Sequence, residues 1–115
     1  MTPRTPKSDL LPGTLDLLVL QTLSLGSLHG YAIAQHIERV SNEVFRVEQG
    51  SLYPALERLQ SRGWVTSKWG RSPTGRRARY YTLTVSGRKQ LGAEISEFDK
   101  LSLAISHVLG RARRV

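Results

Sequence analysis

A run of basic side chains in the second half of the sequence has the clearest chemical meaning. Nine Lys and Arg residues lie between positions 58 and 89, whereas no Asp or Glu occurs between Glu57 and Glu94. Solvated surfaces usually mix both signs of charge. Guanidinium groups match the geometry of phosphate oxygens, and each neutralised phosphate releases condensed counterions. The run therefore indicates a surface that binds nucleic acid. Its candidate contact residues are Arg58, Lys68, Arg71, Arg76, Arg77 and Arg79.

A second set of polar side chains is suited to reading bases. The spacing of Leu52, Leu56 and Leu59 predicts a helix over about 49–62 with one buried stripe. Gln49 and Ser51 then lie at the helix N-terminus, where a recognition helix meets base edges. Ser51 could equally contact a phosphate.

Two further residues of this helix leave alternatives open. Tyr53 flanks the predicted groove-facing surface, so it either donates its hydroxyl to a phosphate or packs in the core with a hydrated tip. Glu57 is an acid close to the predicted phosphate surface. It either pairs with a neighbouring arginine or lies back from the groove.

Other chemistries find little support in the sequence. His29, His36 and His107 are too widely separated for metal-ligand spacing, and there is no cysteine for thiolate chemistry or disulfides. No paired carboxylates, Ser/His/Asp set or glycine-rich phosphate loop is recognisable. We therefore expect neither an enzyme nor a metal or cofactor site.

The overall charge agrees with a polyanionic partner. Among 115 residues, 17 are Lys or Arg and nine are Asp or Glu, which gives a net charge of +8. Such a balance favours nucleic acid or an anionic membrane. The apolar-rich stretch 10–28 is interrupted by proline, glycine and polar residues, and no signal peptide is recognisable. We expect a cytoplasmic protein that does not enter the membrane.

The elements that must position these residues can be read from the apolar spacing. A first helix is expected from a Thr14 cap to just before Gly26, and a second from His29 or Gly30 with Tyr31 and Val40 in its inner stripe. Strands are expected at 64–69 and 79–83, joined by the long basic loop GRSPTGRRA. The predicted fold class is mainly α with a small β-hairpin, a winged helix-turn-helix.

A last helix from Thr84 to about residue 109 is too long for so small a domain to cover. Its apolar seam predicts a homodimer. The predicted interface residues are Leu91, Ile95, Phe98, Ser102, Ile105 and Leu109. The expected organisation is a flexible basic arm (1–9), a DNA-binding domain (10–84), a dimerisation helix (85–110) and a basic tail (111–115).

Three segments resemble the PadR family of bacterial transcriptional regulators. They are LLPGTLDLLVLQTLSLGSLHGYAIAQHIE, QGSLYPALERLQSRGWV and GRRARYYTLTVSGRKQL, which together fall within residues 10–92. The combination of HGY, GSLYPALERL and YYTLT-x-x-G is specific, and the length resembles the short branch with one C-terminal helix.

This resemblance implies a function as well as a fold. It implies a sequence-specific, DNA-binding homodimer on a pseudo-palindromic operator, with its recognition helices in successive major grooves. Most members are repressors released by small aromatic or drug-like effectors, bound in short members at the dimer interface. Phe98, the one aromatic residue of the last helix, is the candidate lining residue of an effector pocket.

Two other functions compete with a DNA-binding regulator. An RNA-binding or ribosome-associated protein would use the same basic hairpin, with Tyr80 or Tyr81 stacking on bases. A protein-interaction adaptor would use the fold as a scaffold only, which leaves the basic run without an explanation.

Overall fold

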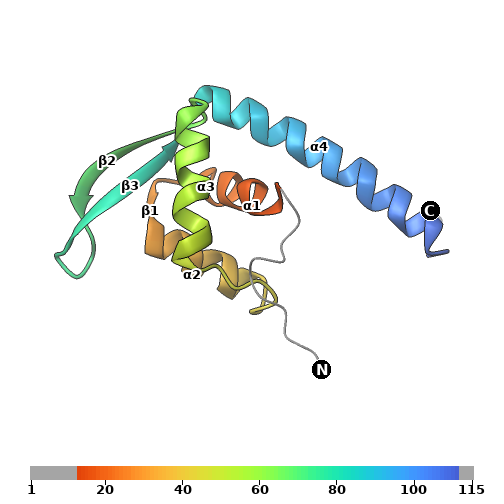
Figure 1. Cartoon of the computed structure of the whole chain (residues 1–115), viewed down its shortest axis with the longest axis horizontal. Helices are drawn as coiled ribbons and strands as arrows, with labels where there is room; N and C mark the ends of the chain where they lie inside the picture. The colour runs from red at the N-terminus through yellow and green to blue at the C-terminus, as the bar shows by residue number, and fades with distance from the viewer. Residues whose placement is uncertain (1–12, 112–115) are drawn as a thin grey trace.

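The computed structural model describes residues 13–111 and places a short antiparallel sheet beside a group of three helices, with a fourth helix leading away from them (Figure 1). The arm expected at 1–9 and most of the tail expected at 111–115 lie outside the described residues. In chain order, the elements are α1 (Thr14–Leu23), β1 (Leu28–His29), α2 (Gly30–Val40), α3 (Gln49–Ser61), β2 (Val65–Arg71), β3 (Arg77–Leu83) and α4 (Val85–Val108).

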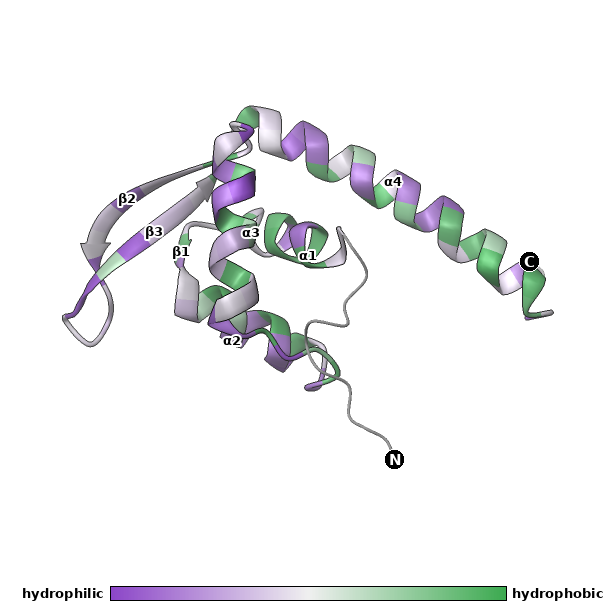
Figure 2. Cartoon of the chain, in the orientation of Figure 1, coloured by the Kyte–Doolittle hydropathy of each residue, from purple (hydrophilic) through white to green (hydrophobic). Residues whose placement is uncertain are grey.

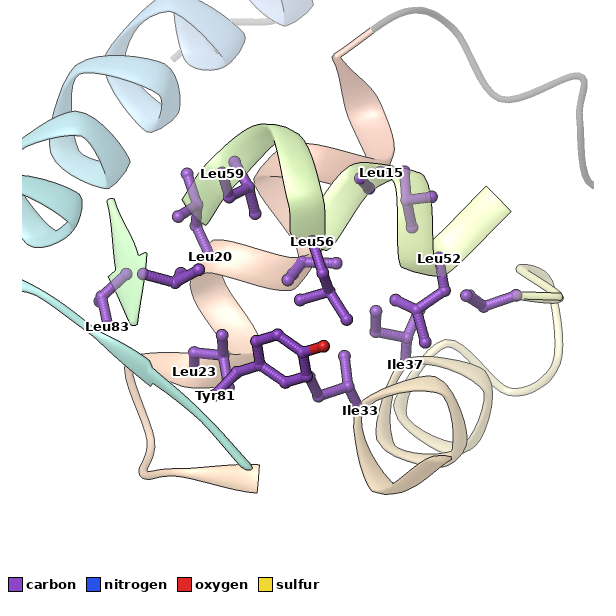
Figure 3. Packing of buried hydrophobic residues seen from close by; sticks show 14 of the residues in the cluster. Leu15, Leu20, Leu23, Ile33, Ile37, Leu52, Leu56, Leu59, Tyr81 and Leu83 are labelled. Atoms are coloured by element: carbon purple, nitrogen blue, oxygen red, sulfur yellow. The ribbon is translucent and has the colours of Figure 1, made fainter. Parts of the chain in front are cut away.

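The core lies where α1, α2 and α3 meet the inner face of the sheet (Figure 3). The predicted stripe of α3 is confirmed, since Leu52, Leu56 and Leu59 are all buried. Burying a leucine side chain stabilises a fold by roughly 1.5–3 kcal/mol. The burial of these three leucines therefore fixes which side of α3 faces inward and leaves the opposite side for solvent or a partner.

The sheet has the strand order β1-β3-β2 with antiparallel neighbours. The two long strands extend further than predicted, so the loop between them covers only residues 72–76. Gly75, with a φ of +86°, donates a hydrogen bond to the Ser72 carbonyl oxygen at 2.8 Å and tightens this turn. The strand β1 was not predicted, and it pairs Leu28 and His29 with the free edge of β3.

Several expectations about the first two helices are wrong. Gly13, not Thr14, is the N-cap of α1. This helix ends at Leu23 because the chain turns there toward the edge of β3. In α2, Tyr31 and Val40 are 61% and 63% exposed, so the inner stripe is narrower than predicted.

The junction between the sheet and α4 is unusually tight. Thr84 caps α4, because its Oγ1 accepts a hydrogen bond from the Gly87 N–H at 2.9 Å. The same hydroxyl donates to the Gly63 carbonyl oxygen at 2.7 Å. A side chain at Gly87 would collide with the carbonyl oxygen of Trp64. The YYTLT-x-x-G motif thus sets the angle at which α4 leaves the sheet.

The helix α4 has 24 residues and is therefore about 36 Å long. Leu91 near its start is buried in the core of its own chain, which leaves this residue little surface for the predicted dimer contact. Apolar residues continue along α4 to its far end (Figure 2). Their side chains are exposed in the single chain: Ile95, Phe98, Leu101, Leu103, Ile105, Val108 and Leu109.

Candidate nucleic-acid interface

The outer side of α3 carries the residues predicted to read bases. Gln49 is exposed in the first turn, and Ser51 beside it is half-buried. Glu48 precedes them as the N-cap residue without a side-chain capping hydrogen bond. The first turn of α3 therefore presents the polar side chain of Gln49 to solvent at the end of the helix that meets base edges in recognition helices.

Tyr53 packs against the start of α2 and is only partly covered. Its ring lies over the backbone at the start of α2, where a Cβ on Gly30 would come within 2.5 Å of the Tyr53 Oη. The side chain nevertheless remains 39% exposed. Gly30 in the HGY motif is thus explained by the close approach of Tyr53. A phosphate contact of the Tyr53 hydroxyl stays a prediction.

The structure gives Arg58 a partner inside the molecule. Its Nη2 lies 2.8 Å from Oδ1 of Asp16, and the two side chains are 51% and 13% exposed. The pair joins the first turn of α1 to the last turns of α3. Arg58 therefore holds α3 in place, and its contact with nucleic acid stays a prediction.

Glu57 does not form the arginine ion pair that was one of its two alternatives within the described residues. It is exposed on α3, and no ion pair within residues 13–111 involves it. Its charge instead contributes to the environment of the Tyr81 hydroxyl.

One face of the wing, formed by β2 and β3, gathers much of the basic run. The register pairs Trp69 with Arg79 and Arg71 with Arg77, so these four side chains share one face. The guanidinium carbons of Arg77 and Arg79 lie 4.2 and 5.4 Å from the Trp69 ring centroid. Arg71 donates from Nη1 to the Gly75 carbonyl oxygen at 2.8 Å and supports the turn.

Two other predicted contacts lie elsewhere on the wing. Lys68 pairs with Tyr80 in the register, which places it on the opposite face of the sheet from Trp69. Arg76 is exposed in the turn itself. All six basic residues predicted as contacts are exposed, but the structure brings only Arg71, Arg77 and Arg79 onto one face.

Sequence reasoning missed the polar chain that links this wing face to α3. Arg79 Nε donates to Ser67 Oγ at 2.9 Å, and Ser67 Oγ donates to Gln60 Oε1 at 3.0 Å. The alternation of residues 67, 69 and 71 along one strand would have placed them on one face. Their partners could be found only with the cross-strand register, which the sequence does not state.

A groove separates the start of α2 from the turn of the wing. It has a volume of about 730 Å³ and is lined by His29, Tyr31 and Gln35 on one side and by Arg76 and Arg77 on the other. His29 caps α2 by accepting a hydrogen bond at Nδ1 from the Ala32 N–H at 3.3 Å. The groove thus opens between two surfaces that attract anions, the N-terminal end of a helix and the wing arginines.

Tyr81 lies at the base of the wing and marks the edge of the core. Burial raises the pKa of the Tyr81 hydroxyl, while the nearby charge of Arg79 partly opposes the increase. The hydroxyl is therefore held in its neutral form. The expectation that Tyr81 could stack on RNA bases does not fit its position, because its side chain is almost completely buried.

A second groove of about 550 Å³ lies between α1 and α4. Its apolar lining includes Leu17, Phe98 and Ile105, and two carboxylates, Glu94 and Glu97, lie at its border. Phe98, which the sequence assigned to an effector pocket, is thus placed in a groove that is open in the single chain.

Within residues 13–111, no helix has the length and hydropathy needed to cross a bilayer. The same part of the chain contains no cluster of three or more His, Cys, Asp or Glu side chains suited to a metal ion.

Sequence comparisons place this chain in a known family. Residues 19–93 match the model of the transcriptional regulator PadR-like family. The chain is 31% identical to the transcriptional regulator Rv3488 of Mycobacterium tuberculosis over 98 residues, covering 82% of this chain and 88% of that protein. It is 29% identical to the negative transcriptional regulator PadR of Bacillus subtilis over 77 residues, covering 67% of this chain but only 42% of that longer protein.

Solved structures agree with this assignment. A transcriptional regulator from Clostridium thermocellum superposes with a TM-score of 0.78 at 28% identity, covering 90% of this chain and 97% of that one. A PadR family regulator from Clostridium difficile gives a TM-score of 0.72 at 27% identity, with coverages of 84% and 99%. The family expected from the motifs is therefore confirmed, as is the winged helix-turn-helix fold. This chain belongs to the PadR-like family of transcriptional regulators, and it is not an enzyme.

Proposed function

We propose that this regulator is a ligand-responsive repressor that binds a pseudo-palindromic DNA operator as a homodimer. One observation carries the DNA-binding part of this proposal. The first turn of α3 and the basic face of the wing are both exposed, and the Arg79–Ser67–Gln60 hydrogen bonds join the wing to α3. A recognition helix and a cationic hairpin held in fixed relation match a major groove and its flanking backbone.

In the proposed complex, Gln49 and Ser51 contact base edges while the wing contacts phosphates. Tyr53, which is 39% exposed, adds a phosphate contact from the side of α3. Arg71, Arg76, Arg77 and Arg79 supply the charge on the wing. Base contacts then determine the sequence, and the wing contacts determine affinity and its dependence on salt.

The exposed seam of α4 supports a homodimer. Large apolar side chains from Ile95 to Leu109 are exposed on a helix that projects beyond the core of its own chain. An apolar surface of this kind usually marks an interface. We assign the interface to Ile95, Phe98, Ser102, Ile105 and Leu109 together with α1, and we leave Leu91 out because it packs in its own core.

The groove between α1 and α4 supports an effector site at the same interface. Phe98 offers an aromatic face beside the aliphatic side chains of Leu17, Leu101, Ile105 and Leu109. A small aromatic or drug-like molecule fits such a surface. The carboxylates of Glu94 and Glu97 outnumber Arg111, the one Lys or Arg in the lining, and favour effectors that carry a positive charge. Repression is proposed because the similar Bacillus subtilis protein is a negative regulator.

The test is duplex binding as a function of salt. A fluorescent duplex from upstream of the protein's own gene is titrated with an excess of random duplex present. Arg76→Ala/Arg77→Ala should weaken binding to every sequence and reduce the salt slope by about one unit for each lost phosphate contact. Arg88→Ala/Lys89→Ala removes the same charge from the start of α4 and serves as the matched control.

The outcomes of this experiment separate the competing functions. Competitor-resistant binding that saturates at two chains per duplex supports the proposal. An equal loss of salt dependence in both double variants would mean that the wing makes no specific contact. Tighter binding to structured RNA than to any duplex would instead favour the RNA-binding alternative.

A further inference from the structure

Trp69 has no role in the proposed function, yet it occupies the centre of the basic wing face. The side chain is 52% exposed. Leaving a large aromatic ring half in water forgoes much of the burial that stabilises such residues. Its position is therefore not explained by packing in the core.

The contacts of Trp69 are with two arginines. The guanidinium carbon of Arg77 lies 4.2 Å from the ring centroid, and that of Arg79 lies 5.4 Å away. Both distances are within the range of cation–π attraction. The ring thus brings together two positive charges that would otherwise repel each other and move freely on flexible side chains.

Arg79 is restrained from a second side as well. Its Nε donates to Ser67 Oγ, which in turn donates to Gln60 Oε1 on α3. The hydrogen bond to Ser67 involves the Nε of Arg79 and does not use the two terminal nitrogens of its guanidinium. No ion pair within the described part of the chain engages either Arg77 or Arg79 with a carboxylate. Arg77 and Arg79 are therefore held in place, and their positive charges remain available to a phosphate.

We infer that Trp69 is a positioning residue that holds Arg77 and Arg79 as a preformed clamp for the phosphates of duplex DNA. The inference rests on the proposed DNA-binding function and assigns a task to a side chain outside the basic set. Guanidinium groups that are already fixed lose less conformational freedom when a phosphate binds. The Trp69 ring is occupied by these groups, so a nucleic-acid base would have to displace them before it could stack.

The test compares Trp69→Leu and Trp69→Phe with the wild type in duplex binding over a range of salt concentrations. Leucine keeps an apolar side chain but offers no π face. We expect Trp69→Leu to weaken duplex binding about five-fold and to lower the salt slope by roughly one unit, although every arginine is retained. Trp69→Phe should recover most of the affinity, because a phenyl ring still attracts cations.

A separate readout distinguishes positioning from simple stabilisation of the wing. In a Trp64→Phe background, Trp69 is the one tryptophan left, so its fluorescence reports on this face. Its emission should change on adding duplex, with the same midpoint as binding. Trp64→Phe alone also serves as a control and should keep the wild-type salt slope.

Each other outcome overturns the inference. If Trp69→Leu lowers the melting temperature but leaves the salt slope unchanged, the ring only stabilises the hairpin. If the wild type prefers single-stranded DNA and Trp69→Leu abolishes that preference, the ring stacks on bases. If the variants bind duplex like the wild type, this inference fails while the proposed function stands. If the wild type binds no duplex at all, the proposed function fails first.

Discussion

The ion pair between Asp16 and Arg58 offers a sharp test of how α3 is held in place. Replacing Arg58 by Met removes the charge but keeps much of the side-chain volume. It leaves the Asp16 carboxylate, whose side chain is 13% exposed, without its cation. Losing one partner of a fully buried pair costs about 3–5 kcal/mol, and a surface pair is worth about 0–1 kcal/mol. For this half-buried pair we expect a loss of about 2–3 kcal/mol.

The reverse change should be less damaging. In Asp16→Asn, the unpaired group is Arg58, whose side chain is 51% exposed and can be hydrated. We expect a loss of about 1 kcal/mol, partly because the carboxylate also stabilises the first turn of α1. The double variant should cost less than the sum of the two single changes, because the second substitution removes a group that is already unpaired.

The assay is urea unfolding of the four proteins at one fixed chain concentration, since dimerisation would make stability depend on concentration. Losses that simply add would refute the assignment of a coupled pair, and equal losses in the two single variants would refute the predicted asymmetry. The same proteins also test Arg58 as a DNA contact. If Arg58 holds α3 and touches no phosphate, Arg58→Met keeps the wild-type salt slope of duplex binding.

Three other predictions follow from the fold. Gly87→Ala should lower stability by about 2–3 kcal/mol in urea unfolding because its methyl group meets a backbone carbonyl, whereas Gly92→Ala on the open side of α4 should be neutral or stabilising. The raised pKa of Tyr81 means that its stabilising contribution is complete below pH 10 and is lost as the pH rises through the folded-state pKa. Stability should therefore fall less steeply above pH 10 in Tyr81→Phe than in the wild type. Ile105→Asp should shift the protein to monomer in sedimentation, whereas Val85→Asp on the same helix should not; a dimeric Ile105→Asp would place the interface elsewhere.

Periodic features of the sequence predicted their elements well. Leu52, Leu56 and Leu59 define α3 because one helix face must be apolar to be buried, and that constraint is local in sequence. The tight junction at Thr84 was likewise predictable as a helix start. The apolar seam of α4 identified a surface that its own chain does not cover.

The features that were missed depend on contacts between distant segments. The strand β1 has two residues, too few to show any alternation, and it forms because β3 offers a free edge. The ion pair of Arg58 was missed because its partner, Asp16, lies 42 residues earlier in the chain. The contact of Trp69 with Arg79 depends on the cross-strand register, which pairs the two residues. None of these pairings follows from local spacing.

The Thr84–Gly87 junction ties the base of the wing to the first turn of α4, so we expect the two elements to move together. The backbone at the base of the wing touches the first turn of α4 directly, with no flexible linker between them. In a homodimer joined through α4, the crossing angle of the two helices would set the distance between the two wings. Tilting a helix about 36 Å long by about 5° moves its end by roughly 3 Å. An effector bound between α1 and α4 would change the crossing angle of the two α4 helices. The dimer would then fit a different operator spacing, although the effector itself would not contact the DNA.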